Sequence, residues 1–273
     1  MEKRPFNILI TAGGTSEKID SVRRISNSGT GTLGALVAEA FAANVPDCNI
    51  VYICSEGAVR PDASLLSSAE LEIIVADDVP SVDKAIRNAC AKTSFDAIIH
   101  SMAISDYCVR AVSDTALMSG DILERLAKVP CEHVSPEDVI QEALFSPPGF
   151  GCDRSSSKIS SDKDNLIIVL EKAPKLIASL RGLAKDAVIV GFKLLSEVSE
   201  DELVRVGHSL LLKNDCDFVL ANDSKTVMSG NHEGLLIGRD GTYVSASSKE
   251  SIAKLIVKSV IATSGATTSD TKQ

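Results

Sequence analysis

The apolar residues of this chain gather in short continuous runs instead of alternating with polar ones. The runs are rich in Ile and Val and lie at Asn7–Ala12, Asn49–Cys54, Leu71–Ala76, Ala97–His100, Leu166–Leu170, Ala187–Phe192 and Phe218–Ala221. Such runs are typical of strands that are covered on both faces of a parallel sheet. Helical spacing of apolar residues follows at Leu33–Ala43, Val79–Lys92, Lys175–Leu183, Glu200–Leu212 and Lys249–Ile261. This alternation predicts a doubly wound α/β fold with a mostly parallel, Rossmann-like sheet.

Two stretches depart from this alternation. Residues 111–157 contain no clear strand and include Pro147-Pro148-Gly149 and Ser155-Ser156-Ser157. We interpret them as an excursion from the core (6–110 and 158–262) that holds one or two helices and a mobile flap. Near the end, Asp240-Gly241 separates two short apolar runs, which predicts a C-terminal hairpin. The small, polar residues 263–273 predict a disordered tail, and we interpret 1–273 as a single domain.

Two glycine-rich loops stand near the beginning of the chain. Gly13-Gly14 follows the first predicted strand, and Gly29–Gly34 opens the first predicted helix. Backbone N–H groups at a helix N-terminus favour a phosphate. The second loop also matches the dinucleotide-binding pattern, but the polar stretch Ser16–Ser26 separates it from the strand that it should follow directly. A phosphate-binding loop is therefore favoured over an NAD(P) site and over a purely structural glycine turn.

Composition narrows the classes of protein to consider. The chain has 273 residues, of which 44% are apolar and 24% charged, as in ordinary globular proteins. A net charge of −9 argues against a general binder of nucleic acid or membrane surfaces, and 4% aromatic residues without Trp argue against base-stacking platforms. No apolar run approaches the roughly 20 residues of a membrane span. The seven cysteines form no CxxC pair, and no leader segment is evident, so we expect a cytoplasmic protein with reduced thiols.

Several ordered blocks of the sequence together resemble a known family. They are Thr11-Ala12-Gly13-Gly14-Thr15, Asp20, Val22-Arg23, Ile25-Ser26-Asn27, Gly31-x-x-Gly34, Met102-Ala103-Ile104-Ser105-Asp106-Tyr107, Lys158-Ile159-Ser160-Ser161, Lys172-Ala173-Pro174-Lys175, Val190-Gly191-Phe192-Lys193-Leu194 and Ala221-Asn222-Asp223. Over residues 7–238 the chain is similar to phosphopantothenoylcysteine synthetase, the phosphopantothenate–cysteine ligase of coenzyme A biosynthesis. It most resembles the free-standing bacterial form.

This resemblance implies a reaction in two steps. A nucleoside triphosphate, with CTP favoured over ATP, activates the carboxylate of 4′-phosphopantothenate to an acyl-nucleotide and releases pyrophosphate. The amine of L-cysteine then displaces the nucleotide to form an amide. The family also implies Mg²⁺ as cofactor and a cytoplasmic homodimer in which the excursion reaches the second subunit.

The resemblance assigns roles to particular side chains. Lys158 would contact the α-phosphate, and Asn27 would bind and orient the acyl-nucleotide. Asp106 would contact the metal or the nucleotide. The remaining predicted contacts to nucleotide or phosphopantothenate are Gly13, Gly31, Gly34, Ser101, Met102, Ala103, Pro174, Lys175, Leu176, Ile177, Phe192, Lys193, Lys213 and Asn222. Each has an ordinary alternative, such as a solvated lysine for Lys158 and Lys213, a turn residue for Asn27, a helix cap for Asp106 and a core residue for Phe192.

The chain departs from the family pattern at two positions. Thr32 stands where many members have Lys or Arg, and Ser209 stands where fused bacterial members tend to have Lys. Two other functions stay open. A short-chain NAD(P)-dependent reductase would need a Tyr-x-x-x-Lys pair, which none of the three tyrosines provides. A non-catalytic nucleotide sensor on the same fold would have lost the counterparts of Asn27 or Lys158, and both are present.

Overall fold

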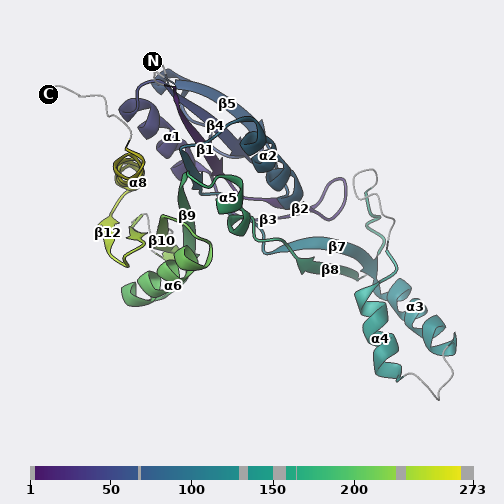
Figure 1. The fold of residues 1–273 in the computed structure, drawn as a ribbon. Helices are drawn as coiled ribbons and strands as arrows, with labels where there is room; N and C mark the ends of the chain where they lie inside the picture. Colours follow the sequence, from purple (N-terminus) through teal and green to yellow (C-terminus); the bar gives the residue numbers. More distant parts are fainter. Residues whose placement is uncertain are drawn as a thin grey trace. The chain divides into compact units, whose positions relative to one another are not determined.

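The computed structural model describes residues 4–66, 69–128, 135–149, 158–163, 165–225 and 232–265. Along the chain the elements are β1 (Phe6–Ala12), β2 (Ser16–Lys18), β3 (Arg24–Ser26), α1 (Thr32–Asn44), β4 (Cys48–Cys54), η1 (Ala63–Leu65), β5 (Ala69–Val75), α2 (Val79–Lys92), β6 (Ala97–His100), β7 (Tyr107–Asp114), α3 (Thr115–Lys128), α4 (Pro136–Phe145), β8 (Leu166–Lys172), α5 (Ile177–Leu183), β9 (Val188–Leu195), α6 (Glu200–Lys213), β10 (Phe218–Asp223), β11 (Gly234–Gly238), β12 (Tyr243–Ala246) and α8 (Lys249–Ser264) (Figure 1).

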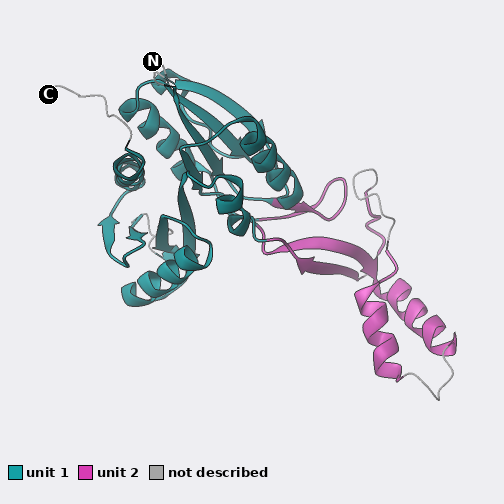
Figure 2. Cartoon of the chain, in the orientation of Figure 1, with its two compact units in different colours: residues 1–15, 27–104, 175–273 teal, residues 16–26, 105–174 magenta. Residues whose placement is uncertain are grey.

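The described chain forms two compact units. Unit 1 comprises 1–15, 27–104 and 175–273, and unit 2 comprises 16–26 and 105–174 (Figure 2). The second unit is thus larger than the predicted excursion 111–157, and it also takes in the short hairpin of β2 and β3. The predicted flap residues 155–157 lie outside the described residues, as do Cys131, Cys152 and most of the predicted tail.

Unit 1 is built on an eight-stranded sheet in the order β12-β11-β10-β9-β6-β1-β4-β5. The neighbours from β5 to β10 pair in parallel, whereas β11 and β12 pair antiparallel as the predicted C-terminal hairpin. One face of the sheet packs on α1 and α8 through a core that contains Ile8, Ile99, Leu220 and Phe41. The other face packs on α2, α5 and α6. The predicted doubly wound α/β fold with a mostly parallel sheet is therefore confirmed.

Local sequence explains where the helices of unit 1 begin. Asp78 caps α2 by accepting from the Ser81 N–H, and Ser248 caps α8 in the same way from Ser251. Both are capping boxes, since the N3 serine side chain also accepts from the N-cap backbone. Helix α8 continues to Ser264 and ends at Gly265 with φ +67°, so the end of the helix comes later than the predicted tail suggested.

Unit 2 corrects one prediction. Leu166–Leu170 was expected to be a strand of the parallel sheet, but it belongs to β8, which pairs antiparallel with β7 in a separate two-stranded sheet. The apolar run is only partly buried there, because a two-stranded sheet gives its side chains fewer neighbours than the eight-stranded sheet of unit 1. The predicted helices of the excursion are α3 and α4, which contact each other.

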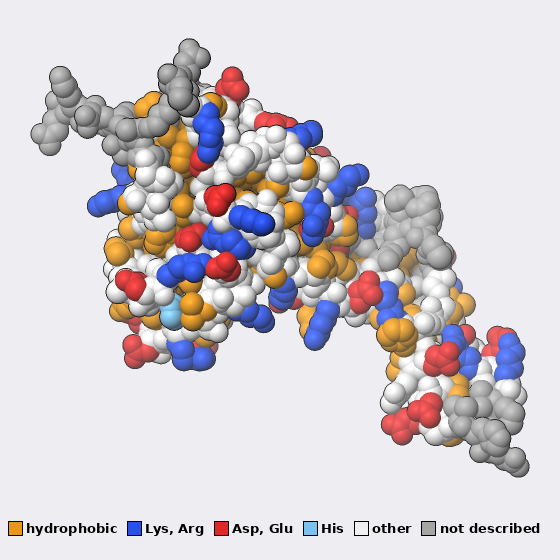
Figure 3. All heavy atoms as spheres, in the orientation of Figure 1, with side chains coloured by type: hydrophobic (Ala, Val, Ile, Leu, Met, Phe, Trp, Pro, Cys, Tyr) orange, Lys and Arg blue, Asp and Glu red, His pale blue; other side chains and the backbone are white. Residues whose placement is uncertain are grey.

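The surface carries charged side chains of both signs. Basic and acidic side chains are interspersed over the face drawn in Figure 3. No helix in the part of the chain that the structure describes has the length and apolar character to cross a membrane.

Cys48, Cys54, Cys90, Cys108 and Cys216 are free cysteines. Burial raises the pKa of the Cys48 and Cys216 thiols to about 11, so these two are packing residues and not nucleophiles.

Candidate active site

The sheet of unit 1 changes its winding direction between β1 and β6. From β1 the chain passes through α1 to β4 on one side, and from β5 it passes through α2 to β6 on the other side of β1. The crevice outside the carboxyl ends of two such strands is the usual ligand site of an open α/β sheet. Here a bridge between Gly14 and Ala103 extends the pairing beyond both strand ends. The predicted residues Gly13 and Ser101–Ala103 therefore lie at this edge.

Asn27 is hydrogen-bonded to the turn that follows β6. Its Nδ2 donates to the Ala103 carbonyl oxygen at 3.0 Å, and its backbone N–H donates to the Thr15 carbonyl at 3.0 Å. The Ala103 carbonyl also accepts from the Thr15 N–H at 3.0 Å. Because Asn27 is exposed, its side chain is accessible to a ligand while its backbone is fixed. The structure thus brings together Asn27 and Ala103, two residues that were predicted to bind the same acyl-nucleotide.

Neighbouring segments of the chain lie too close to Gly13 and Gly34 for any side chain to fit at either position. Gly13 has φ +91°, and a Cβ there would lie 2.4 Å from Ser55 Oγ and 2.8 Å from Ala58 Cβ. A Cβ at Gly34 would lie 2.6 Å from Ala12 Cβ. Both distances are far below a normal van der Waals contact, so any side chain would push these segments apart. The structure thus gives both glycines a packing reason, and their predicted contact with phosphate stays a prediction.

Gly31 links the same loop to the first helix. It is the N-cap of α1 with φ +79°, and a Cβ there would lie 3.0 Å from Ala58 Cβ and 3.2 Å from Gly13 N. The side chains of Thr30 and Thr32 contact each other at the start of the helix, with Oγ1 atoms 3.0 Å apart. A glycine turn therefore leads directly into the positive end of a helix of 13 residues at this edge. This is the arrangement expected of the predicted phosphate-binding loop.

A buried histidine supports the turn after β6. His100 Nδ1 lies within hydrogen-bond distance of Thr11 Oγ1, at 2.9 Å. Thr11 Oγ1 accepts a hydrogen bond from the Met102 N–H at 3.3 Å. Ser101 Oγ donates to the Thr11 carbonyl oxygen at 2.6 Å. Burial lowers the pKa of His100 to about 4, so the imidazole is neutral at neutral pH. His100 therefore has a structural role and helps to hold the backbone of residues 101–103 in place.

The depressed pKa of His100 predicts a pH-dependent stability. Between the unfolded pKa of about 6.5 and the folded pKa of about 4, the unfolded chain binds a proton that the folded chain does not, so stability falls as pH falls through this window. We expect a loss of about 1.4 kcal/mol between pH 7.5 and pH 5.5 from this group. Urea unfolding of the wild type and of His100→Asn, which keeps a polar group beside Thr11 but does not titrate, measures it. If the free energy of unfolding fell equally with pH in the two proteins, His100 would not be the group responsible.

The ends of β9 and β10 supply three further predicted residues. Phe192 is half-buried and packs on the core between the sheet and the α1–α8 layer. Asn222 lies opposite Leu194 in the register, two residues beyond the partner of Phe192, and therefore shares that face of the sheet. Lys193 points to the other face, beside Ala221. Phe192 and Asn222 are thus on the α1 side of the carboxyl edge, and Lys193 is on the α6 side.

Lys213 lies at the opposite edge of the sheet. It occupies the last turn of α6, and the chain then turns back so that the Asp217 N–H donates to the Ile189 carbonyl at the beginning of β9. Asn222, by contrast, is at the carboxyl end of β10. The structure therefore does not bring Lys213 to the edge that holds the other predicted residues of unit 1. Ser209 precedes it by about one turn on the same helix.

The turn before α5 mixes exposed and buried residues. Pro174 and Lys175 are exposed, whereas Leu176 is 3% exposed and its carbonyl accepts from Ser179. Ile177 faces β9, since a Cβ on Gly191 would lie 2.8 Å from its Cδ1 atom. The side chains of Leu176 and Ile177 therefore serve the core, and a ligand contact from either residue would have to use the backbone.

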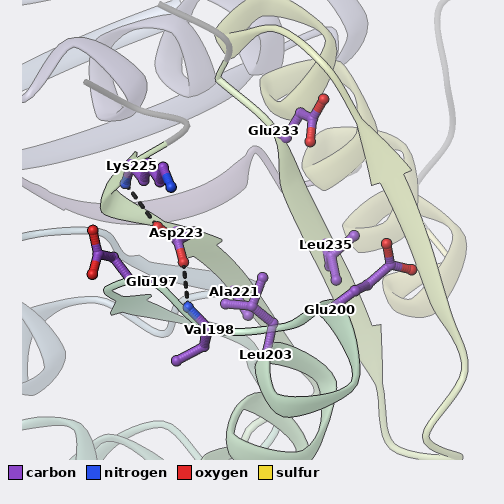
Figure 4. A pocket seen from close by; sticks show the side chains of 9 residues that line it. All are labelled: Glu197, Val198, Glu200, Leu203, Ala221, Asp223, Lys225, Glu233 and Leu235. Carbon is purple, nitrogen blue, oxygen red and sulfur yellow. Dashed lines mark hydrogen bonds between the residues drawn. The ribbon is translucent and has the colours of Figure 1, made fainter. Parts of the chain in front are cut away.

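A cavity of about 480 Å³ lies on the α6 side at the end of β10 (Figure 4). Its lining residues are Glu197, Val198, Glu200, Leu203, Ala221, Asp223, Lys225, Glu233 and Leu235. None of them was predicted to bind a ligand, although Ala221 and Asp223 belong to one of the family blocks. Asp223 accepts from the backbone N–H groups of Val198 and Lys225 at 2.9 and 2.7 Å, and these bonds hold its pKa below the usual range. Its carboxylate therefore joins the segment before α6 to the residues that directly follow β10.

Unit 2 contains the other two predicted polar residues. Asp106 is exposed just before β7, and its carbonyl oxygen accepts from the Ala173 N–H at 2.9 Å beside the end of β8. Lys158 is exposed in a segment without regular structure. The residue after it, Ile159, is hydrogen-bonded to Asp20 and Arg23. Asp20 and Arg23 belong to the family pattern, but their bond to Ile159 spans more than 130 residues and cannot be inferred from sequence spacing.

The residues present fit a magnesium ion only as a companion of a nucleotide. The described part of the chain has no cluster of three His, Cys, Asp or Glu side chains that could hold a metal ion. Mg²⁺ commonly uses one or two carboxylates together with substrate phosphates. A single carboxylate such as Asp106 meets that lesser requirement, and its contact with the ion stays a prediction.

Comparison with known proteins identifies the family. The model of the DNA/pantothenate metabolism flavoprotein C-terminal domain matches residues 4–142 and 152–263. The chain belongs to this family. A solved member, the DNA/pantothenate metabolism flavoprotein from Streptococcus pneumoniae, is 26% identical with a TM-score of 0.71, and the match covers 94% of this chain and 99% of that one. The family assignment therefore holds for both the sequence and the fold.

Several relatives of this chain have names that specify a reaction or a pathway. The coenzyme A biosynthesis bifunctional protein CoaBC of Methanocaldococcus jannaschii is 28% identical over 95% of this chain, and that of Thermococcus kodakarensis is 25% identical over 85%. The chain spans about half the length of these two relatives (51% and 45%). The phosphopantothenate–cysteine ligase CAB2 of Saccharomyces cerevisiae is 25% identical over 95% of this chain and 76% of its own length. A Cab2 variant in complex with phosphopantothenate-cysteine has the same fold, with 20% identity, a TM-score of 0.61 and coverage of 96% and 87%.

Proposed function

We propose that this chain is a phosphopantothenate–cysteine ligase of coenzyme A biosynthesis. The observation that carries the proposal is the match to the yeast ligase over 95% of this chain, because that relative is named for this single reaction. The arrangement at the β1–β6 edge adds support, since it places a glycine turn, a helix N-terminus and the side chain of Asn27 at the usual ligand site of an open α/β sheet.

The first step of the proposed reaction needs positive charge beside the nucleotide. A carboxylate oxygen of 4′-phosphopantothenate attacks the α-phosphorus of a nucleoside triphosphate, and pyrophosphate leaves. Lys158 neutralises charge on the α-phosphate as a compact point charge. Asp106 would hold the magnesium ion that accompanies the nucleotide, and that ion would supply positive charge to the leaving phosphates. Backbone groups of residues 101–103 hold the base, and the N-terminus of α1 holds a phosphate.

The second step needs the acyl group to be held in one orientation. The amine of L-cysteine attacks the acyl carbon, the nucleoside monophosphate leaves, and the amine loses a proton. Asn27 holds the acyl-nucleotide for this attack, because an amide both donates and accepts and this one is fixed by the Ala103 carbonyl. Phe192 packs on the base and Asn222 contacts the ligand from the same face. Lys193 and Lys175 supply further positive charge.

We further propose that CTP is preferred over ATP and that the protein acts as a homodimer. The nucleotide proposal rests on the resemblance to bacterial members, which prefer CTP. Phe192-Lys193-Leu194 resembles free-standing and eukaryotic members more than fused bacterial ones, and the eukaryotic members prefer ATP, so the assay compares both nucleotides. The dimer proposal is supported by exposed apolar side chains on the helices of unit 2, where Leu123 is 68% and Phe145 70% exposed.

Pyrophosphate release by the purified protein tests the proposed function. With Mg²⁺, 4′-phosphopantothenate, L-cysteine and either CTP or ATP, we expect release that depends on phosphopantothenate and is faster with CTP. Phosphopantothenate is needed because its carboxylate is the group that displaces pyrophosphate in the proposed first step. Omitting phosphopantothenate is the control. An absence of release with both nucleotides, at a concentration at which the protein is dimeric, would contradict the ligase function and favour a nucleotide sensor.

A further inference from the structure

A fully buried threonine on β1 binds the turn that follows β6. Thr11 is 0% exposed, and its Oγ1 accepts from the Met102 N–H at 3.3 Å. Its carbonyl oxygen accepts from the Ser101 N–H at 3.1 Å and from Ser101 Oγ at 2.6 Å. The Ala103 N–H donates to the Gly13 carbonyl oxygen at 2.9 Å. Thr11 and Gly13 together thus bind the N–H groups of all three residues of this turn.

The bond to Met102 differs in kind from the other two. Carbonyl groups of β1 bind the N–H groups of residues 101 and 103, as in a parallel ladder, where alternate residues face the same neighbouring strand. Such a ladder gives the intervening N–H of Met102 no acceptor on the β1 backbone. In the described part of the chain, β6 pairs with β9 only as far as His100 and Gly191. The Thr11 hydroxyl therefore supplies an acceptor where neither ladder does.

His100 fixes the direction of this hydroxyl. The imidazole is 6% exposed, and its Nδ1 lies 2.9 Å from Thr11 Oγ1. The ring is neutral at neutral pH, because burial lowers its pKa to about 4. We assign its proton to Nε2, since Nδ1 then accepts the hydroxyl proton of Thr11 and the lone pairs of Oγ1 are left for the Met102 N–H.

The turn that is held in this way borders the proposed base site. Gly191 is the β9 partner of His100, so Ser101 and Phe192 each come directly after the last pair of these two strands. The backbone of residues 101–103 and the half-buried ring of Phe192 are the two groups proposed to contact the base. They thus lie beside each other at the carboxyl edge, and a shift of the Met102 peptide would displace one of them relative to the other.

We infer that Thr11 is a positioning residue for the nucleotide base. Because it is fully buried, it acts through the Met102 backbone and does not touch the ligand. This inference rests on the proposed function, from which it takes the contact between the base and residues 101–103. Asn27 is anchored separately, on the Ala103 carbonyl oxygen. Loss of the Thr11 hydroxyl should therefore weaken nucleotide binding and leave the second step of the reaction unchanged.

Thr11→Val tests the inference, because it keeps the shape of the side chain and removes the hydroxyl. With the nucleotide that the wild type uses faster, we expect its KM to rise about tenfold, the effect of one lost hydrogen bond. We expect kcat to change less than about threefold, and KM for phosphopantothenate and for L-cysteine less than about twofold. Thr11→Ser keeps the acceptor and should retain the wild-type KM. The Met102 amide should exchange hydrogen faster in Thr11→Val than in the other two proteins.

Ser251→Ala is the matched control for lost stability. Ser251 Oγ donates to the Ser248 carbonyl oxygen at 2.9 Å and accepts from the Ser248 N–H at 2.9 Å. These bonds cap α8 beside β12, the outermost strand of the sheet. The control should lower the thermal midpoint and leave every KM unchanged. Thr11→Cys keeps a weak acceptor and should give an intermediate KM, so it replaces Thr11→Val if thermal unfolding shows that the valine variant does not fold.

The possible outcomes separate this inference from the ligase function. A wild-type nucleotide KM in folded Thr11→Val, or an equal rise in Thr11→Val and Thr11→Ser, would overturn the inference and leave the ligase function standing. A fall in kcat with all three KM values raised would also overturn it, because that result indicates a general structural role.

Calorimetric titration of the same proteins with CTP and with ATP provides a readout that does not depend on turnover. A wild type that binds a nucleotide but releases no pyrophosphate would overturn the ligase function, and the affinity of Thr11→Val would then decide the inference. A wild type that binds neither nucleotide would overturn both.

Discussion

Lys158→Ala should reduce phosphopantothenate-dependent pyrophosphate release by about 10²- to 10³-fold, the usual cost of removing one charged group that stabilises a transition state. The loss is expected in kcat, because the developing charge on the α-phosphate is greater in the transition state than in the bound nucleotide. Single-turnover pyrophosphate release with saturating CTP measures it. Lys128→Ala is the control, since this lysine is also exposed in unit 2 but pairs with Glu124 on α3.

The contrasting variant is Asn27→Ala. It should still release pyrophosphate, while amide formation falls and the acyl-nucleotide accumulates, because Asn27 is assigned to the second step. Chromatography of quenched reactions distinguishes intermediate from product. If Asn27→Ala blocked pyrophosphate release as strongly as Lys158→Ala, the division of roles between the two residues would be wrong.

Gly13→Ala should be among the most destabilising single-methyl substitutions in unit 1. The new Cβ would lie 2.4 Å from Ser55 Oγ and 2.8 Å from Ala58 Cβ, at a backbone φ of +91° that side chains rarely adopt. Strain and overpacking together should lower the free energy of unfolding by about 2–5 kcal/mol. Urea denaturation monitored by circular dichroism measures the change.

Gly57→Ala provides the matched control for this substitution. Gly57 lies in the loop that Gly13 contacts, but a Cβ there meets no atom within 4 Å. Its free energy of unfolding should change by less than about 1 kcal/mol. If Gly13→Ala were as stable as Gly57→Ala, the loop around Ser55 would have to move freely, and the close packing of the glycine loops would not be a constraint.

The sequence predicted the parts of this fold that depend on local pattern. Helix α2 has the predicted bounds, and β1, β4 and β6 lie within one residue of the predicted runs, whereas β9 continues three residues past its run to Leu195. Strand β8 was misplaced because an apolar run does not tell whether its second face is covered by helices or left half-exposed. Strand β7 was missed because it contains Arg110, Ser113 and Asp114, which a buried parallel strand would exclude.

For the candidate site, the sequence indicated which residues to consider but not where the fold places them. Family blocks selected Asn27 and Ala103, and the structure brings them into contact. The position of Lys213 at the far edge of the sheet follows from the direction of α6, which residue type alone does not show. The bond from Asp20 to Ile159 joins residues 139 positions apart, so only the folded chain reveals it.

The pairing of β7 with β8 has a consequence for how the chain folds. Strands β6 and β9 are neighbours in the sheet, yet all of residues 105–174 lie between Ile104 and Lys175, which belong to the same unit. Closing so long a loop is entropically costly and slows folding. The bond from the Ala173 N–H to the Asp106 carbonyl joins the two ends of that segment. If the β7–β8 ladder forms early, the loop that remains to be closed is reduced to residues 101–106 and 173–187. Substitutions that weaken this ladder should therefore slow the folding of the parallel sheet, although none of its own contacts has changed.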